Sequence, residues 1–216
     1  MKVFYSALTA TLLLALSSAI AQNAAPIRWA EGAPNATSDM KDNVKIEGLK
    51  TDDVHIYVGM AEIKDTEYNR VWIQVTNRSK DAINFDPASA VLVNDKGKTV
   101  PAEVPNKAAN SIQKYGEAKR DELSSAHCNM AGAVQCQPTN AEMQMSKQVA
   151  AFSASQAQWV RDNALAKKTL APGEEVQGAI PFRKDKKAAD YILRIPVGST
   201  TFEFPLSAQN KRPSYD

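Results

Sequence analysis

The residues with most potential for chemistry lie in one short segment, HCNMAGAVQC (127–136), which holds both cysteines and one of the two histidines of the chain. Imidazole, thiolate and thioether groups are ligands that copper(I) favours, so His127, Cys128, Met130 and Cys136 form a candidate soft-metal site. The two cysteines equally suit a disulfide, because thiols are oxidised in extracytoplasmic compartments. A catalytic dithiol is disfavoured, since such pairs usually have the Cys-x-x-Cys spacing.

Of these alternatives we favour a Cys128–Cys136 disulfide. Met143 and Met145 could add sulfur ligands. They are two positions apart on an expected helix, however, so their side chains point about 200° from each other and cannot chelate one metal together. A disulfide across so short a loop stabilises the fold by roughly 2.6 kcal/mol in the loop-entropy model. The sequence therefore predicts a disulfide without bound metal or other cofactor, and thiol labelling together with elemental analysis for copper decides between the two.

The rest of the chain offers no familiar catalytic set. It contains no nucleophile elbow, zinc-protease, dinucleotide or phosphate-loop motif. Besides His127, the one histidine is His55, which lies on an expected strand, on the face opposite Val54 and Ile56, where a solvated histidine is the ordinary case. We therefore expect a protein that is not an enzyme.

The N-terminus has the pattern of a secretory signal peptide, residues 1–21. Lys2 supplies the positive charge, residues 7–16 are apolar, and Ala19-Ile20-Ala21 matches the A-x-A cleavage pattern. The apolar run is too short for a membrane span, which needs about 20 residues. The mature chain is expected to begin at Gln22, to be secreted or periplasmic, and to carry no membrane anchor.

The charge balance argues against two classes of partner. The chain has 26 Lys and Arg against 24 Asp and Glu, and Lys2 leaves with the signal, so the mature chain is nearly neutral. A nucleic-acid binder or an electrostatic membrane binder would need a basic excess. The expected partner is an unidentified protein or envelope ligand.

Hydrophobic alternation with a period of two predicts β-strands in two blocks, residues 52–105 and 169–206. The clearest case is the set of inward positions Val54, Ile56, Val58 and Met60. Turns are expected at 94–97 and at Pro172-Gly173. Residues 22–51 lack such periodicity and are expected to be an extended lead-in, and residues 207–216 a flexible tail.

Between the strand blocks, residues 106–168 predict a helical hairpin. One helix is expected from about 108 to 125. A second runs from 141 to 167, after the capping box formed by Thr139 and Glu142. Its apolar positions, expected to face the first helix or the strands, are Met145, Val149, Phe152 and Trp159. The opposite side is a candidate binding face with Lys147, Ser153 and Gln158.

Together these elements predict a mainly β protein in which residues 52–206 form an immunoglobulin-like antiparallel β-sandwich with the helical hairpin inserted. The two strand blocks have the length of about seven short strands, as an immunoglobulin-type sandwich requires. Both cysteines fall in the insertion, so the likeness is to the architecture alone.

Two segments also resemble a bacterial domain family. They are YNRVWIQVTNRSKDAINFDPASAVLVNDKGKTV and TLAPGEEVQGAIPFRKDKKAADYILRIPVGSTTFEFPL. They are similar to secreted or lipoprotein-type immunoglobulin-like domains of unknown function, related in fold to mycobacterial immunoprotective extracellular antigens. The resemblance covers residues 54–104 and 169–206, implies an extracytoplasmic sandwich, and transfers no catalytic residue.

We therefore expect a non-enzymatic extracytoplasmic binding or scaffolding protein. The alternative is a periplasmic protein that handles copper or another metal through the 127–136 segment. A hydrolase assembled from scattered residues ranks last.

Overall fold

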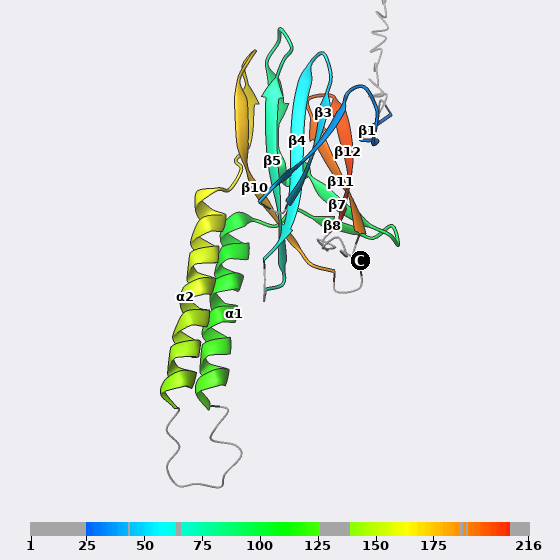
Figure 1. Ribbon diagram of the computed structural model, residues 1–216. Helices are drawn as coiled ribbons and strands as arrows, with labels where there is room; N and C mark the ends of the chain where they lie inside the picture. Colours follow the sequence, from blue (N-terminus) through cyan, green and yellow to red (C-terminus); the bar gives the residue numbers. More distant parts are fainter. Residues whose placement is uncertain are drawn as a thin grey trace, which may run out of the picture.

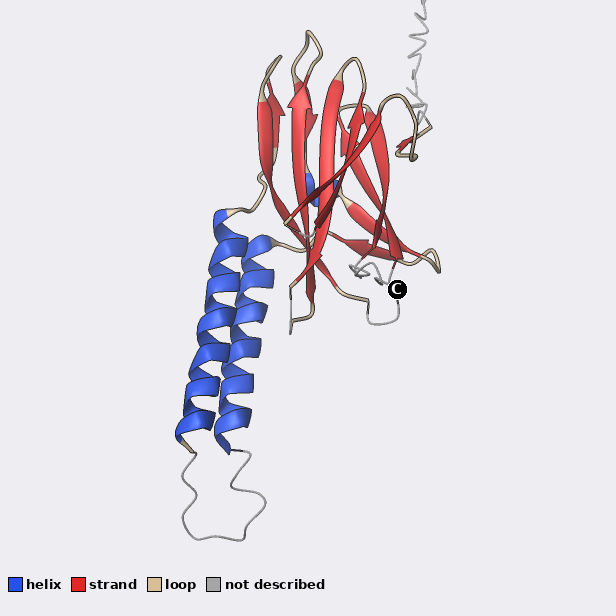
Figure 2. Cartoon of the chain, viewed as in Figure 1, coloured by secondary structure: helices blue, strands red, loops and turns tan. Residues whose placement is uncertain are grey.

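The computed structural model describes residues 25–42, 44–63, 66–125, 139–185, 188 and 190–207. In these ranges the protein is mainly β, with two sheets and a helical hairpin that projects from one end of them (Figures 1 and 2). No helix in the described ranges is long and apolar enough to cross a membrane. The expected signal peptide, the 127–136 segment and the expected tail beyond Ser207 lie outside the described residues.

The first sheet is antiparallel and has five strands, in the order β10-β5-β4-β3-β2. They are β10 (Glu175–Arg183), β5 (Tyr68–Asn77), β4 (Val54–Glu62), β3 (Val44–Lys50) and β2 (Ala36–Lys41). The alternation expected along β4 is confirmed, because Val54, Ile56, Val58 and Met60 are buried.

The second sheet has seven strands. Its main path is β1 (Ile27–Arg28), β12 (Thr200–Ser207), β11 (Asp190–Val197), β6 (Ile83–Phe85) and β9 (Lys168–Leu170). β11 also pairs with β7 (Val91–Asn94), which pairs with β8 (Thr99–Pro101), and a short 3-10 helix η1 (Pro87–Ser89) lies between β6 and β7. The β1–β12 pair is parallel and the other pairs are antiparallel.

The expected lead-in is wrong in one respect, because much of residues 22–51 belongs to the sheets. β1 extends the second sheet, and the hairpin of β2 and β3 completes the first. The residues of β2 are mostly exposed and polar, as suits an edge strand. Such a strand has no buried face to impose an alternating pattern, which is why its sequence carries no period of two.

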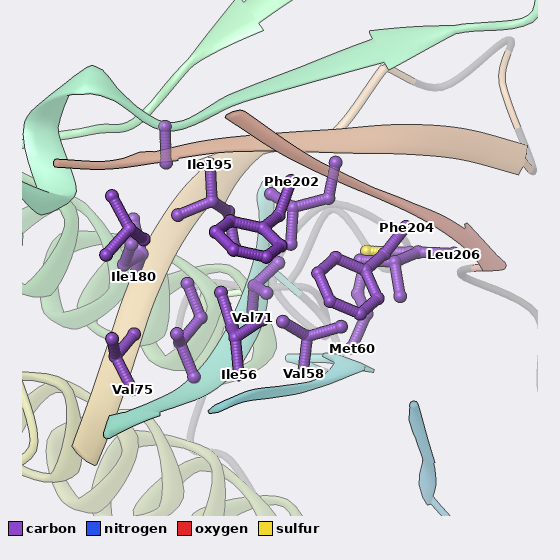
Figure 3. Close-up of a cluster of buried hydrophobic side chains, with 14 of the residues drawn as sticks. Ile56, Val58, Met60, Val71, Val75, Ile180, Ile195, Phe202, Phe204 and Leu206 are labelled. Atoms are coloured by element: carbon purple, nitrogen blue, oxygen red, sulfur yellow. The ribbon is translucent and has the colours of Figure 1, made fainter. Parts of the chain in front are cut away.

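The core lies between the two sheets, whose inner faces contact each other. Figure 3 shows Phe202, Phe204 and Leu206 of β12 against Ile56 and Val58 of β4, and each of these side chains is buried. Burying large apolar side chains contributes roughly 1.5–3 kcal/mol each, so this interior supplies most of the stability of the β-part.

The expected turns are confirmed. Gly97 has a φ of +75° in the turn between β7 and β8, and Gly173 has a φ of +78° after Pro172. Positive φ is accessible to glycine without a steric penalty, which explains its presence at both places.

The helices are α1 (Pro105–Ser125) and α2 (Asn140–Asp162). The capping box is present, with the Thr139 hydroxyl accepting from the Glu142 amide and the Glu142 carboxylate accepting from the Thr139 amide. α2 ends at Asp162, not Lys167. The reason is that the following backbone pairs with β10: the Ala179 amide donates to the Asn163 carbonyl at 2.7 Å, and the Leu165 amide donates to Ala179 at 3.2 Å.

The buried face of α2 differs in part from the expected one: Trp159 packs against the cluster at the sheet and Val149 is half-buried, but the other two expected positions are not covered. Met145 and Phe152 are exposed, at 56% and 45%, whereas Ser153 is buried at 5%. The inward positions on α2 are mainly small: Ser146, Ser153, Ala157 and Val160. A Cβ at Gly116 of α1 would collide with Ser153, so the two helices approach too closely for larger side chains. Backbone proximity, not the apolar stripe, decides which face is buried.

Candidate functional site

A groove of about 640 Å³ lies on the outer face of the first sheet, the face turned away from the core. Residues of all five strands line it, and Trp159 of α2 is added from the hairpin. The groove is therefore built where the helical hairpin meets the sheet.

Strand register sets the floor of the groove as rows that run across the sheet. One row contains Asp39, Ile46, Gly59, Trp72 and Ala179. The neighbouring row contains Thr37, Gly48, Tyr57, Gln74 and Gln177. Because side chains alternate between faces, all of these point outward while Val58, Val71 and Ile73 fill the core.

Two glycines keep the floor low. A Cβ at Gly48 would lie 2.6 Å from the Tyr57 ring, so this ring lies over the glycine backbone. A Cβ at Gly59 would collide with the Ile46 side chain, which extends over the same strand. Glycine at these positions lets the neighbouring side chains lie flat, and the space above them stays open.

The root of the hairpin forms one wall of the groove. Trp159 of α2 stacks on Arg70 of β5, with the guanidinium carbon 4.6 Å from the ring centroid. Beside it, the outward side chains Ile63 and Tyr68 are buried in a cluster with helix residues such as Ile112. This second, smaller cluster holds Trp159 in place against the sheet.

Several polar side chains of the groove have no hydrogen bond or ion pair with any described residue. Arg70 is half-buried, which lowers the pKa of its guanidinium, and it makes no ion pair or hydrogen bond with any described residue. The amides of Gln74 and Gln177 likewise have no hydrogen bond within the described ranges. Across the groove, on the β2 side, lie the exposed carboxylates Asp39 and Asp42. The groove is therefore basic on the α2 side and carries carboxylates on the β2 side.

The binding face expected on α2 is not formed. Lys147 and Gln158 are exposed as expected, but Ser153 faces α1. Helical geometry alone predicts that these side chains do not share a face, because Ser153 is six residues after Lys147 and so lies about 240° around the helix from it.

His55 lies on the outer face of β4, as expected, and is half-buried. Partial burial lowers its pKa, and the nearby charges of Arg78 and Lys50 lower it further. In the described ranges no group of three or more His, Cys, Asp or Glu side chains could hold a metal ion. The disulfide and the alternative metal site, His127, Cys128, Met130 and Cys136, fall outside those ranges and stay predictions.

Sequence reasoning missed the groove. A signal was present in the alternation of β4 and β5, where large outward side chains, Tyr57, Arg70 and Trp72, accompany the outward Gly59. Outward aromatic residues beside an outward glycine indicate a hollowed sheet face. Trp159 could not have been added to it, because its position depends on how the hairpin packs.

Comparisons with known proteins name no family for this chain. No family model matches it, and no curated protein matches it. A solved structure with weak similarity is that of the yjhA protein from Bacillus subtilis, with 11% sequence identity, a TM-score of 0.36, and coverage of 68% of this chain and 76% of that chain. The resemblance to bacterial immunoglobulin-like domains therefore stays a prediction.

Proposed function

We propose that the protein is a non-enzymatic extracytoplasmic binding protein, an immunoglobulin-like sandwich that takes its ligand in the groove on the outer face of the first sheet. The observation that carries this proposal is the grouping of Tyr57, Trp72 and Trp159 around one groove, beside polar side chains that have no hydrogen bond or ion pair with a described residue.

The composition of the groove supports a binding role. Ligand sites in proteins are concave, about 300–1,000 Å³ in volume, lined mainly by apolar and aromatic groups, and supplied with a few oriented polar groups. This groove has about 640 Å³, and its lining combines aromatic and aliphatic side chains with polar and charged ones. Half-exposed aromatic rings offer a large apolar contact area at low entropic cost.

The surroundings of the groove carboxylates support the non-enzymatic part. Asp39 and Asp42 are both exposed, on and beside the edge strand β2, and one Asp39 oxygen accepts a hydrogen bond from the Met40 amide at 2.7 Å. Carboxylates that act as general acids or bases usually lie buried or beside a close charged neighbour. Asp39 and Asp42 are instead exposed.

Tryptophan fluorescence offers a direct test, since two of the three tryptophans line the groove. The mature protein is titrated with oligosaccharides, tripeptides and phospholipid headgroups. We expect at least one class to change the emission of the wild type and not of W72A. The variant I192A, on the other sheet, is the control, because Ile192 is exposed at 41% far from the groove.

Two results would overturn the proposal. One is binding that W72A and W159A leave unchanged. The other is chemical conversion of a bound compound, detected by mass spectrometry, which would make the protein an enzyme. N-terminal sequencing of exported protein, expected to begin at Gln22, tests the extracytoplasmic part.

A further inference from the structure

We infer that the groove binds a saccharide that carries a single carboxylate, with the acidic group on Arg70 and the sugar rings on Tyr57 and Trp72. This inference rests on the proposed binding function and names its ligand class.

Arg70 is the first reason. Its guanidinium is half-buried against the Trp159 ring and has no acidic partner among the described residues. Stacking covers one face of the guanidinium and leaves the N–H groups at its edge free to donate. A planar guanidinium fork matches a carboxylate in bidentate geometry, and an unpaired half-buried cation gains by acquiring such a partner.

The aromatic floor is the second reason. Tyr57 lies over Gly48, and Trp72 is its diagonal neighbour on the adjacent strand β5. Sugar rings have apolar C–H faces that pack on aromatic rings, and hydroxyl groups around their edges. The unpaired amides of Gln74 and Gln177 can both donate to and accept from such hydroxyls.

The position of the groove favours a saccharide over an extended peptide. Peptides that bind a sheet through their backbone add to a free strand edge. The central floor is formed by β3, β4 and β5, each paired on both sides. It offers side chains only, and a ligand there must supply its own donors and acceptors, as a sugar does.

The far side of the groove limits the ligand to one acidic group. β2 and β5 are three strand spacings apart, or roughly 14 Å. Asp39, Lys41 and Asp42 on the β2 side carry a net negative charge. The carboxylates can accept hydrogen bonds from hydroxyl groups but repel a second acid, so a polyuronate fits poorly.

Two matched pairs of sugars test the inference by calorimetry on the mature protein. N-acetylglucosaminyl-N-acetylmuramic acid differs from diacetylchitobiose mainly by its lactyl carboxylate, and sialyllactose differs from lactose by an acidic sugar. We expect the acidic member of at least one pair to bind about tenfold tighter than its neutral partner. The pair that shows this difference identifies the source of the acid.

Variants locate the effect. R70Q should remove the preference for the acidic sugar over its neutral partner, and W72A should weaken the binding of both sugars. K147Q is the matched control, because Lys147 is an exposed cation on α2 outside the groove.

The outcomes separate this inference from the proposed function. If acidic and neutral sugars bind equally and R70Q changes neither affinity, the ligand is not recognised through a carboxylate, but the proposed binding function of the groove stands. If only peptides or phospholipid headgroups bind, and W72A abolishes this binding, the ligand is not a saccharide and the proposed binding function stands. Binding that is indifferent to W72A and W159A overturns both.

Discussion

Glu47 is a buried carboxylate with too few partners. It is 2% exposed on the inner side of β3, where the Lys45 ammonium, 2.8 Å away, contacts one oxygen and the other oxygen, Oε2, has no hydrogen bond. By contrast Glu203, 3% exposed, lies between Arg28 at 2.6 Å and Arg194 at 2.8 Å. Burial raises the pKa of Glu47, and the Lys45 contact only partly opposes this.

A pH-dependent stability difference follows for E47Q. The pKa of Glu47 in the folded chain lies above its ordinary value of 4.5, so its protonation stabilises the fold below that value. This contribution is lost as the pH rises through the folded pKa. Urea titrations at a series of pH values from below 4.5 to neutral measure this effect. The free energy of unfolding of E47Q should rise relative to that of the wild type as the pH rises, and the difference should reach about 1 kcal/mol at neutral pH.

E67Q provides the control, because it removes a carboxylate charge from an exposed position. If the difference in stability between E47Q and the wild type is the same at every pH, folding does not change the pKa of Glu47.

Asn77 connects the two sheets through a side chain with no exposed surface. Its amide donates to the carbonyls of Asp81 at 2.8 Å and Leu170 at 2.9 Å, and its oxygen accepts from the amide and hydroxyl of Ser79. N77D would lose both donated bonds and bury a charge. We expect a loss of about 3 kcal/mol or more in the free energy of unfolding.

A nearby residue provides the matched substitution. Asn84 is exposed and its oxygen accepts from the Thr169 hydroxyl at 2.7 Å, a bond that aspartate retains. N84D should therefore be nearly neutral in the same denaturation experiment, and similar losses in the two variants would contradict the role given to Asn77.

At the scale of elements, the hairpin depends on the close contact of α1 and α2 at Gly116. G116A would place a methyl group against Ser153, so it should destabilise the hairpin by about 1–3 kcal/mol, although alanine is the better helix former. Thermal melting followed by circular dichroism measures this loss.

Compensation provides the sharper test. The double variant G116A/S153G adds a methyl group to α1 but removes the Ser153 side chain that it would clash with on α2, so it should recover part of the stability. E117A, at an exposed neighbouring position, should cost little. If G116A is more stable than the wild type, the helices are not held at this separation.

The hairpin is also fastened to the sheet at both ends. On one side the Glu103 amide donates to the Pro181 carbonyl at 2.9 Å, and on the other Leu165 pairs with Ala179. Both bonds are made to β10, whose neighbour β5 carries Arg70 and Trp72. The wall formed by Trp159 therefore has a defined position relative to the floor of the groove.

At the scale of the whole molecule, the two clusters of buried side chains indicate that the two sheets can fold without the helical hairpin. Among the described residues, the core between the sheets contains none from α1 or α2, whereas the smaller cluster joins both helices to Ile63 and Tyr68. Replacing residues 106–161 by a Gly-Ser linker should leave a cooperatively melting β-protein. Its stability should be lower, since Ile63 and Tyr68 become exposed.

The same deletion removes Trp159, so it should also weaken ligand binding in the groove. Circular dichroism, thermal melting and titration with acidic sugars measure the three consequences. An unfolded product would make the hairpin part of the folding unit, and a folded product with full affinity would remove α2 from the site.

Local sequence pattern is enough to predict features that depend on near neighbours in the chain. The alternation of Val54 to Met60 predicts β4 because its two faces meet different environments. The capping box of Thr139 and Glu142 marks the start of α2, because both partners lie within one turn. The turns at Gly97 and Gly173 follow from the φ angles that glycine permits.

Features that depend on contacts between distant parts of the chain could not be predicted from local pattern. Ser153 is buried and Phe152 exposed because α1 approaches at Gly116, and α2 ends where its continuation pairs with β10. The groove is the clearest case. Asp39, Trp72 and Trp159 are far apart in the chain, and strand register and hairpin packing place them around one groove. The local sequence pattern indicates which face of an element is apolar. Which side chains are buried, and which distant residues lie together, depends on the element that packs against that face.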